Sequence, residues 1–242
     1  MIPRQITSLQ HPLVKHLVKL RQDKEYREQE KCVLVSGIKL VTELASRLPV
    51  KILIADKEYS GIAADEVVLA TSEMLKKITG LQNPEGIAAV VALPPPADLK
   101  NCRKLLILDE ISDPGNAGTL LRTALALGWD GAFFTAGSAD PFNEKAIRAA
   151  KGATFRLPLR TGSWDELSSL TAGKQVLIAD VAGEPLNRVQ KKEKIVLILG
   201  NEARGVSSQG KKLGMLVSIP MAPAMESLNV ASAGAILMYT LG

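Results

Sequence analysis

From residue 104 to the end of the chain, short apolar runs alternate with stretches of helical periodicity. The expected extended runs are residues 104–108, 131–135, 155–159, 175–179, 195–199 and 217–219, and the expected helices are residues 117–127, 143–150, 164–170 and 228–241. This alternation is typical of a mostly parallel sheet flanked by helices, whose binding sites lie at the carboxyl ends of the strands. The sequence therefore predicts an α/β domain and directs attention to the turns that follow its strands.

Three consecutive prolines, Pro94, Pro95 and Pro96, interrupt the chain before this domain. Such a run neither continues a strand nor nucleates a helix, so we expect an extended linker at residues 94–98 between domains at residues 1–93 and 99–242. Within the first domain we expect strands at residues 32–35, 50–55, 67–69 and 87–93, and helices at residues 15–31, 38–47 and 72–78, the last capped by Ser72. The first domain is thus predicted to be a small α/β unit.

The chain carries a net charge of +5, and its basic excess lies mostly in the second half. Residues 1–98 hold 13 Lys and Arg against 12 Asp and Glu, whereas residues 99–242 hold 17 against 13. This balance favours a polyanionic partner without naming one, and each lysine or arginine cluster taken alone is typical of a solvated face.

Cysteine usage and the absence of long apolar runs bear on the compartment. Cys32 and Cys102 have no partner in a metal-ligand spacing, so we expect reduced structural thiols and no metal site. Residues 1–10 lack the apolar segment of a signal peptide, and no apolar run reaches the length of a membrane span. We therefore expect a cytoplasmic protein.

The turn and helix at residues 109–128 form the first candidate site. Asp113-Pro114-Gly115 ends a strand, and Asn116 stands where a helix N-cap is expected. Arg122 interrupts the apolar stripe of the following helix, a feature that is more often a solvated group than a functional one when seen alone.

Two further turns, at residues 200–205 and 220–229, carry the remaining candidates. Gly200 and Gly205 match the outer glycines of a phosphate loop, but Val206-Ser207 replaces the required Lys-Ser/Thr and excludes a nucleoside triphosphatase of that type. No Gly-x-Gly-x-x-Gly marks a dinucleotide site. Both turns also have a purely structural interpretation, with Glu202 as a helix-start residue, Ser227 as the N-cap of the last helix and Asn229 as a first-turn residue.

Taken together, the three turns resemble the three motifs of the SpoU (TrmH-like) RNA ribose 2'-O-methyltransferases of the trefoil-knotted SPOUT class. The first motif appears as Asn116, Gly118 and Arg122, the second as residues 198–205, and the third as Ile219-Pro220-Met221 followed by Ser227-Leu228-Asn229-Val230-Ala231. The order and spacing agree across the whole second domain. The first domain resembles the small ribosomal-protein-like substrate-binding domain that many members carry before the knot.

This resemblance implies a C-terminal trefoil-knot domain, a homodimer formed through it, and S-adenosyl-L-methionine as cofactor. The implied catalytic residues are Asn116, Arg122, Glu202, Ser227 and Asn229, and the implied cofactor-binding residues are Thr135, Leu199, Gly200, Ile219 and Leu228. Apolar residues on the last helix, namely Val230, Ile236, Leu237 and Tyr239, are candidates for the dimer interface.

The implied reaction is methylation of a ribose 2'-hydroxyl in structured RNA, with rRNA favoured over tRNA. Arg122 stands at the position of the family's catalytic arginine, but a guanidinium with a pKa above ~12 is hard to deprotonate. We therefore expect it to grip a phosphate and orient the 2'-oxygen, with Glu202 pairing with it until RNA arrives. The alternatives are a noncatalytic RNA-binding protein that retains the knot and a SPOUT enzyme that methylates a base, and the target nucleotide stays open.

Overall fold

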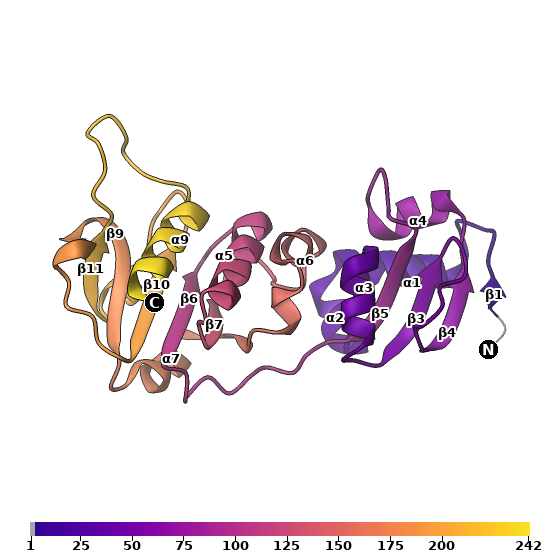
Figure 1. The fold of residues 1–242 in the computed structure, drawn as a ribbon, viewed down its shortest axis with the longest axis horizontal. Helices are drawn as coiled ribbons and strands as arrows, with labels where there is room; N and C mark the ends of the chain where they lie inside the picture. The colour runs from indigo at the N-terminus through magenta and orange to yellow at the C-terminus, as the bar shows by residue number, and fades with distance from the viewer. Residues whose placement is uncertain (1–2) are drawn as a thin grey trace. The chain divides into compact units, whose positions relative to one another are not determined.

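The computed structural model describes residues 3–242, and the chain divides into two compact units (Figure 1). One unit runs up to Pro94 and takes in Phe142–Glu144, and the other comprises Pro95–Pro141 and Lys145–Gly242. The division falls between two prolines of the predicted linker, and residues 93–99 have no regular secondary structure. None of the helices in the described part of the chain is long and apolar enough to cross a membrane.

The N-terminal unit is a mixed five-stranded sheet with helices. Its elements are β1 (Arg4–Gln5), α1 (Pro12–Gln22), α2 (Lys24–Glu30), β2 (Cys32–Ser36), α3 (Ile38–Ala45), β3 (Val50–Ala55), β4 (Ala64–Leu69), α4 (Ser72–Thr79) and β5 (Ile87–Ala92). The strand order is β1-β4-β3-β5-β2, with β5 antiparallel to both of its neighbours. The predicted small α/β unit is therefore present.

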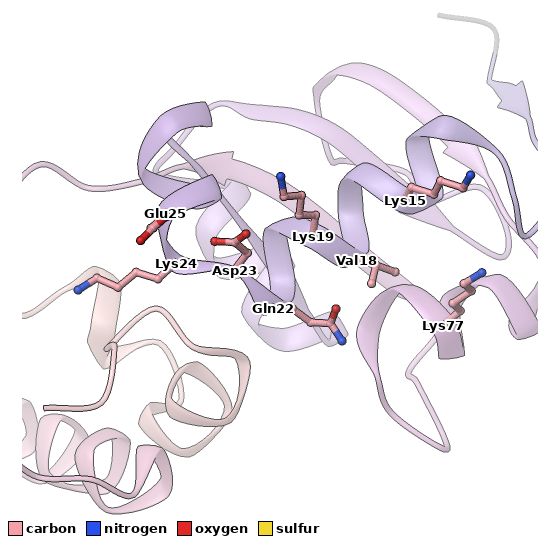
Figure 2. Close-up of a pocket in the computed structure, with 8 residues that line it drawn as sticks. All are labelled: Lys15, Val18, Lys19, Gln22, Asp23, Lys24, Glu25 and Lys77. Carbon is pink, nitrogen blue, oxygen red and sulfur yellow. The ribbon is translucent and has the colours of Figure 1, made fainter. Parts of the chain in front are cut away.

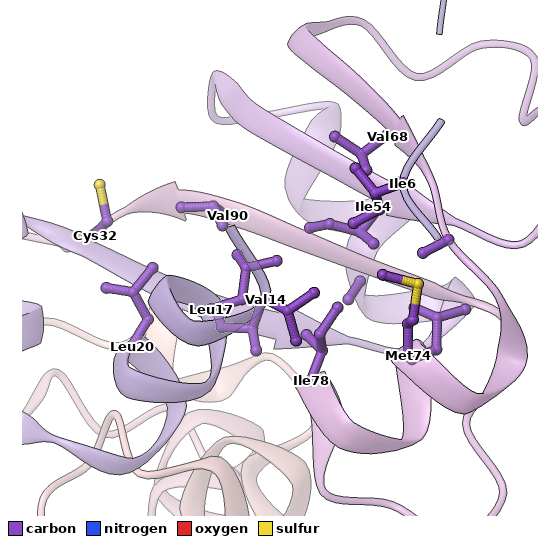
Figure 3. Close-up of a cluster of buried hydrophobic side chains, with 14 residues drawn as sticks. Ile6, Val14, Leu17, Leu20, Cys32, Ile54, Val68, Met74, Ile78 and Val90 are labelled. Carbon is purple, nitrogen blue, oxygen red and sulfur yellow. The ribbon is translucent and has the colours of Figure 1, made fainter. Parts of the chain in front are cut away.

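Helices α1 and α4 pack together and close one core of this unit (Figure 3). Val14, Leu17 and Leu20 are fully buried on one face of α1, as expected for an apolar stripe at helical spacing. The single helix expected over residues 15–31 is interrupted at Asp23, which ends α1 in an extended conformation and caps α2 through its side chain. Ser72 is likewise not a cap, because Thr71 accepts the hydrogen bond from the helix.

The second unit contains the predicted alternation of strands and helices. Its elements are β6 (Lys104–Asp109), α5 (Pro114–Ala126), β7 (Gly131–Thr135), α6 (Glu144–Ala150), η1 (Ala153–Phe155), β8 (Leu159–Gly162), α7 (Trp164–Thr171), β9 (Gln175–Pro185), η2 (Leu186–Arg188), β10 (Ile195–Gly200), α8 (Ser208–Lys211), β11 (Met215–Ser218) and α9 (Val230–Leu241). The extended run expected at residues 155–159 is displaced, because η1 occupies its start and β8 begins only at Leu159.

The six strands of this unit form one sheet in the order β11-β9-β10-β6-β7-β8, and every pairing in it is parallel. The four middle residues of β6 and all of β10 are buried, because both faces of these central strands are covered. In a parallel sheet the carboxyl ends of all strands lie at the same edge. The turns after β6, β7, β9 and β10 are therefore gathered there.

The last helix returns from the edge of the sheet to its middle. After β11, the edge strand beside β9, residues 219–229 lead the chain back, and α9 packs on α5 and β10 (Figure 1). This return places the third motif beside the first and second.

Candidate functional site

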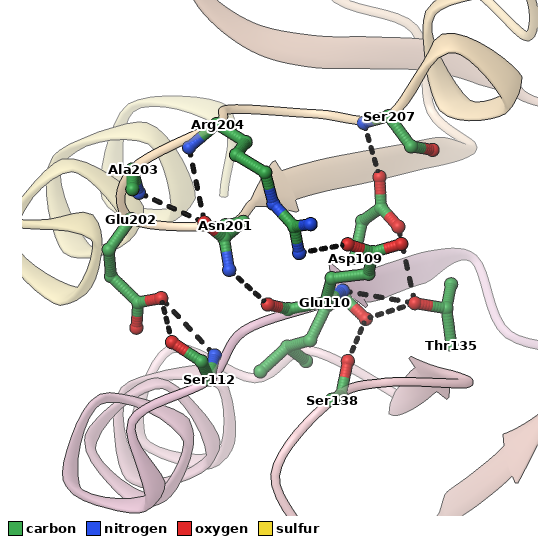
Figure 4. Close-up of polar contacts among 11 residues, drawn as sticks. Asp109, Glu110, Ser112, Thr135, Ser138, Asn201, Glu202, Ala203, Arg204 and Ser207 are labelled. Atoms are coloured by element: carbon green, nitrogen blue, oxygen red, sulfur yellow. Dashed lines mark hydrogen bonds and ion pairs between the residues drawn. The ribbon is translucent and has the colours of Figure 1, made fainter.

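Asp109 ties together the ends of three segments of the sheet. Its side chain is fully buried; Oδ2 accepts a hydrogen bond from the backbone N–H of Ser207 at 2.7 Å, and Oδ1 accepts one from Oγ1 of Thr135 at 3.2 Å (Figure 4). The Thr135 hydroxyl also accepts a hydrogen bond from the backbone N–H of Glu110 at 3.0 Å. Buried polar groups that are mutually satisfied in this way stabilise one arrangement of the strand ends.

Helix α5 begins differently from the sequence-based expectation. Asp113 is its N-cap, accepting from the backbone N–H of Asn116 at 2.8 Å, and Pro114 occupies the first helical position, where its missing N–H costs nothing. The hydrogen bond from Lys145 at 2.5 Å lowers the pKa of Asp113 and keeps this cap charged. Asn116, expected to be the N-cap, is instead a first-turn residue whose side chain is available for other contacts.

The loop after β10 is closed on itself. Asn201 pairs with Gly205 in an isolated bridge, and the Asn201 side chain accepts hydrogen bonds from the backbone of Ala203 and Arg204 at 3.0 and 3.1 Å. A Cβ atom on Gly200 would lie 2.2 Å from the backbone N of Val206, so only glycine permits this close approach. Because α8 begins only at Ser208, Glu202 lies in this loop and not at the start of a helix.

Glu110 connects this loop to the end of β6. Its backbone has a left-handed conformation with φ of 54°, uncommon outside glycine, and its carbonyl accepts from Nδ2 of Asn201 at 2.8 Å (Figure 4). Its carboxylate forms an ion pair with Arg204 at 2.6 Å. Neither Glu110 nor Arg204 was singled out from the sequence, although both belong to turns that the strand-end rule selects.

Glu202 is the hydrogen-bond centre of the site. One oxygen accepts from the backbone N–H and the hydroxyl of Ser112 at 3.2 and 2.9 Å, and the other accepts from the backbone N–H of Asp113 at 3.3 Å and from Nδ2 of Asn116 at 2.9 Å. Burial raises the pKa of Glu202, but the hydrogen bonds from Asn116 and Ser112 outweigh it, and the pKa lies below its ordinary value. Glu202 therefore acts as an ionised anchor for the start of α5.

Asn229 completes a row of hydrogen-bonded side chains that comes from the three motifs. It is the N-cap of α9, accepting from the backbone N–H groups of Ala231 and Ser232, and its Nδ2 donates to Oδ1 of Asn116 at 3.2 Å. Ser227, expected to be the cap, lies two residues earlier, and Asn229 has taken that function. The structure thus links Glu202, Asn116 and Asn229, which are 113 residues apart at most.

Arg122 and Ser227 lie outside this hydrogen-bonded chain. Arg122 is exposed on α5, six residues and about 9 Å of helical rise beyond Asn116. Within residues 3–242 it forms no ion pair, so the expected pairing with Glu202 is wrong, because Ser112, Asp113 and Asn116 occupy that carboxylate. Ser227 is exposed on the return segment.

A cavity of about 670 Å³ borders Glu202 and Asn229. The predicted cofactor-binding residues Leu199, Gly200, Ile219 and Leu228 line it, together with the predicted catalytic residues Glu202, Ser227 and Asn229. Thr135 does not line this cavity, because its hydroxyl is committed to the buried contacts with Asp109 and Glu110. Asp180 and Lys211 also line it, and neither was among the predicted site residues, although Asp180 directly follows the predicted strand at residues 175–179.

A second hollow, of about 790 Å³, belongs to the N-terminal unit (Figure 2). It is lined by Lys15, Val18, Lys19, Gln22, Asp23, Lys24, Glu25 and Lys77. Its four lysines outnumber its two carboxylates, so the hollow is positively charged, and two of the lysines, Lys15 and Lys19, lie one turn apart on α1.

A parallel α/β sheet with a closed glycine loop, a returning C-terminal helix and a cavity beside them agrees with the SPOUT methyltransferase class that the three motifs predict. The chain belongs to the SpoU rRNA Methylase family, which matches residues 103–239, and residues 11–89 match the MRM3-like substrate binding domain. The family membership predicted from the three motifs is thereby confirmed.

Relatives match nearly the whole chain. The chain is 32% identical to the 23S rRNA (guanosine(2553)-2'-O)-methyltransferase RlmP of Bacillus subtilis, covering 98% of this chain and 99% of the relative. A structure from Porphyromonas gingivalis described as an RNA methyltransferase of the TrmH family is 31% identical, with a TM-score of 0.85 and coverage of 97% and 98%. A structure of an AdoMet-bound rRNA methyltransferase from Sinorhizobium meliloti is 27% identical, with a TM-score of 0.86 and coverage of 98% and 97%. These similarities confirm the predicted fold class.

Proposed function

We propose that the protein transfers a methyl group from S-adenosylmethionine to a ribose 2'-hydroxyl of structured RNA, and that this RNA is ribosomal. The observation that carries the proposal is the chain from Glu202 through Asn116 to Asn229, which joins the three family motifs beside a cavity. The B. subtilis relative is named for the same reaction on 23S rRNA. We further propose that residues 1–93 bind the RNA, that residues 94–98 link the domains, and that residues 99–242 carry out the transfer.

The cavity suits S-adenosylmethionine in size and in chemistry. Its volume of about 670 Å³ lies within the usual range of small-molecule sites. Leu199, Ile219 and Leu228 offer apolar walls for a purine ring, and the backbone beside Gly200 offers hydrogen-bonding groups for its edge. The S. meliloti relative, of the same fold, binds this cofactor. When bound, the sulfonium supplies an activated methyl group.

Within this proposal the protein acts mainly by positioning. As the 2'-oxygen forms its bond to the methyl carbon, the bond from carbon to sulfur breaks, S-adenosylhomocysteine is left, and the hydroxyl proton passes to a neighbouring phosphate or to water. Arg122, exposed and without an ion pair among the described residues, holds that phosphate through its two-pronged guanidinium. Correct alignment of two bound reactants supplies several kcal/mol of the barrier reduction.

Glu202 is a poor candidate for the proton acceptor. A general base works best when its pKa lies near the working pH, whereas burial raises the pKa of Glu202 but its hydrogen bonds together outweigh burial and lower that pKa overall. Its oxygens already accept from Ser112, Asp113 and Asn116. We assign it, with Asn116 and Asn229, to holding the geometry of the three motifs, and we place Ser227 at the RNA-facing border of the cavity.

The N-terminal unit supplies a candidate surface for RNA. It matches a substrate-binding family, and Lys15 and Lys19 present two ammonium groups on adjacent turns of α1. Lysines placed this way neutralise phosphates without reading sequence, so we assign them to RNA affinity and not to target choice.

A protein acting on ribosomal RNA is expected in the cytoplasm in a bacterium.

We also propose that the second unit forms a homodimer. On α9, Tyr239 is 76% exposed and Ile236 is 42% exposed, which leaves two large apolar groups on one helix for a partner to cover. Leu237, predicted as an interface residue, is buried within the protomer, and Val230 lines the cavity. A double variant, Ile236→Glu with Tyr239→Glu, should be monomeric in analytical ultracentrifugation. Dimers that persist in this variant would place the interface elsewhere.

The reaction is tested by incubating the protein with tritiated S-adenosylmethionine and total RNA. We expect label in rRNA, in a nucleotide whose 3' linkage resists alkali, because a 2'-O-methyl removes the nucleophile for cleavage. Label in an alkali-sensitive nucleotide would mean base methylation. RNA binding without any label would favour the alternative, a noncatalytic RNA-binding protein.

A further inference from the structure

A bulge in β9 carries a carboxylate into the wall of the cavity. Strand β9 pairs with β10 over Gln175 to Ile178, and the ladder with β11 jumps from Ile178 to Glu184, leaving five residues unpaired. The first three of these, Ala179, Asp180 and Val181, line the cavity. A Cβ on Gly183 would lie 2.4 Å from the backbone N of Val217, so the bulge is pressed tightly against β11.

The Asp180 carboxylate is held in one orientation. One oxygen accepts from the backbone N–H of Ala182 at 3.0 Å, and the other forms an ion pair with Lys211 at 2.7 Å. Its side chain is only 14% exposed, and the hydrogen bond from Lys211 lowers its pKa, so it is ionised. Two carboxylate oxygens offer about four acceptor sites, and within residues 3–242 these two donors use only two.

Asp180 lies on the side of the cavity away from the hydrogen-bonded residues Asn116 and Asn229. Sheet order places β9 and β6 on opposite sides of β10, so the ends of β9 and β6 are two strand spacings, or about 10 Å, apart. The cluster around Asn116 belongs to the β6 side. A cofactor that spans the cavity therefore presents a part other than its reacting methyl to Asp180.

We propose that Asp180 accepts hydrogen bonds from the 2'- and 3'-hydroxyls of the cofactor's ribose, with Lys211 fixing its orientation. The assignment rests on the proposed function, because that supplies the adenosine. A vicinal diol brings two O–H donors to a group that has two free acceptor sites. An acidic residue beyond the end of a strand, next to a strand with a glycine turn, is also how other α/β sheets bind a ribose hydroxyl.

The test is calorimetry with S-adenosylhomocysteine and its 2',3'-dideoxy analogue, using wild-type protein, Asp180→Ala and Asp180→Asn. Wild type should bind the parent compound about ten- to a hundredfold more tightly than the analogue, as expected for hydrogen bonds to a charged acceptor. Asp180→Ala should bind both alike, and Asp180→Asn should retain part of the difference. Asp165→Asn, which changes an exposed carboxylate of the same unit that does not line the cavity, should discriminate as wild type does.

Several outcomes would overturn the assignment. An Asp180→Ala variant that still discriminates, or a wild type that does not, would remove the ribose contact while leaving the proposed function intact. If Asp180→Ala weakens S-adenosylhomocysteine but not 5'-methylthioadenosine, Asp180 faces the amino-acid end instead. A wild type that binds no S-adenosylhomocysteine would overturn the proposed function together with this inference. Unliganded melting curves identify variants that simply unfold.

Discussion

The side-chain amide of Asn116 donates a hydrogen bond to Oε1 of Glu202, 2.9 Å away, across 86 residues of sequence. This contact ties the first turn of α5 to the loop after β10, and the same amide accepts from Asn229 at the start of α9. The family motifs are thus held together through Asn116 before any ligand is considered.

The Asn116–Glu202 contact should show energetic coupling. Asn116→Ala and Glu202→Ala should each destabilise the protein, and the double variant should lose less than the sum, by about 1 kcal/mol, because one hydrogen bond cannot be lost twice. Urea unfolding of the four proteins measures this. Strict additivity would mean that the contact contributes nothing to stability.

Stability should fall at acid pH through carboxylates whose pKa is lowered in the folded protein. Burial raises the pKa of Glu202 but hydrogen bonds lower it overall, and the hydrogen bond from Lys145 lowers that of Asp113. A lowered folded-state pKa gives stability that is complete above the unfolded value and is lost as the pH falls through the folded one. The loss should therefore begin near pH 4.5 for Glu202 and near pH 3.8 for Asp113, their ordinary values, and continue below them.

Glu202→Gln should flatten this acid dependence, measured as the free energy of unfolding between pH 7 and 3. Glu58→Gln, which removes an exposed carboxylate of the N-terminal unit, is the control. An unchanged slope in Glu202→Gln would show that Glu202 titrates alike in the folded and unfolded states.

Arg122→Ala should reduce methyl transfer at least about a hundredfold while leaving the affinity for S-adenosylhomocysteine near wild type, because Arg122 is not among the residues that line the cavity. Arg122→Lys keeps the charge but loses the two-pronged geometry and should recover only part of the rate. Arg103→Ala, at an exposed arginine before the amino end of β6, should leave both the rate and the affinity unchanged. Normal turnover by Arg122→Ala would remove Arg122 from the site.

Gly200→Ala should disorder the loop after β10, because the added Cβ would lie 2.2 Å from the backbone N of Val206 and 2.3 Å from the carbonyl carbon of Gly205. We expect the affinity for S-adenosylhomocysteine to fall at least about tenfold, since this loop lines the cavity. Gly128→Ala meets no atom within 4 Å and should cost only about 1–2 kcal/mol of backbone strain at a φ of 68°. Equal calorimetric affinities for wild type and Gly200→Ala would contradict the close-approach argument.

Lys15→Glu with Lys19→Glu should weaken RNA binding at every sequence tested and reduce the steepness of its salt dependence, since each phosphate contact contributes to that slope. Filter binding at several salt concentrations measures both. Lys57→Glu, at an exposed lysine outside the hollow, is the matched control. An unchanged slope would place the RNA on another surface.

Much of the fold and part of the site followed from local pattern. The apolar runs at residues 104–108 and 195–199 became β6 and β10, because a strand covered on both faces must be apolar throughout. The strand-end rule selected the turns that hold Asn116, Glu202 and Asn229, and the chemistry of those residue types selected the side chains. Even Asn229, expected only in the first turn of α9, was placed within one residue of its position as the cap.

What the tertiary structure decided concerns partners distant in sequence. Four hydrogen-bond donors, from Ser112, Asp113 and Asn116, bind the Glu202 carboxylate. Their proximity depends on how β6 and β10 pair, so the expected pairing of Glu202 with Arg122 is wrong. The bulge that brings Asp180 to the cavity exists because β11 pairs with β9 in two separate stretches. The sequence determined which segments form strands and helices and which turns carry the candidate site residues, since these depend on spacing and residue type. Only the folded sheet determined which side chains meet, because hydrogen bonds require atoms within about 3 Å of each other.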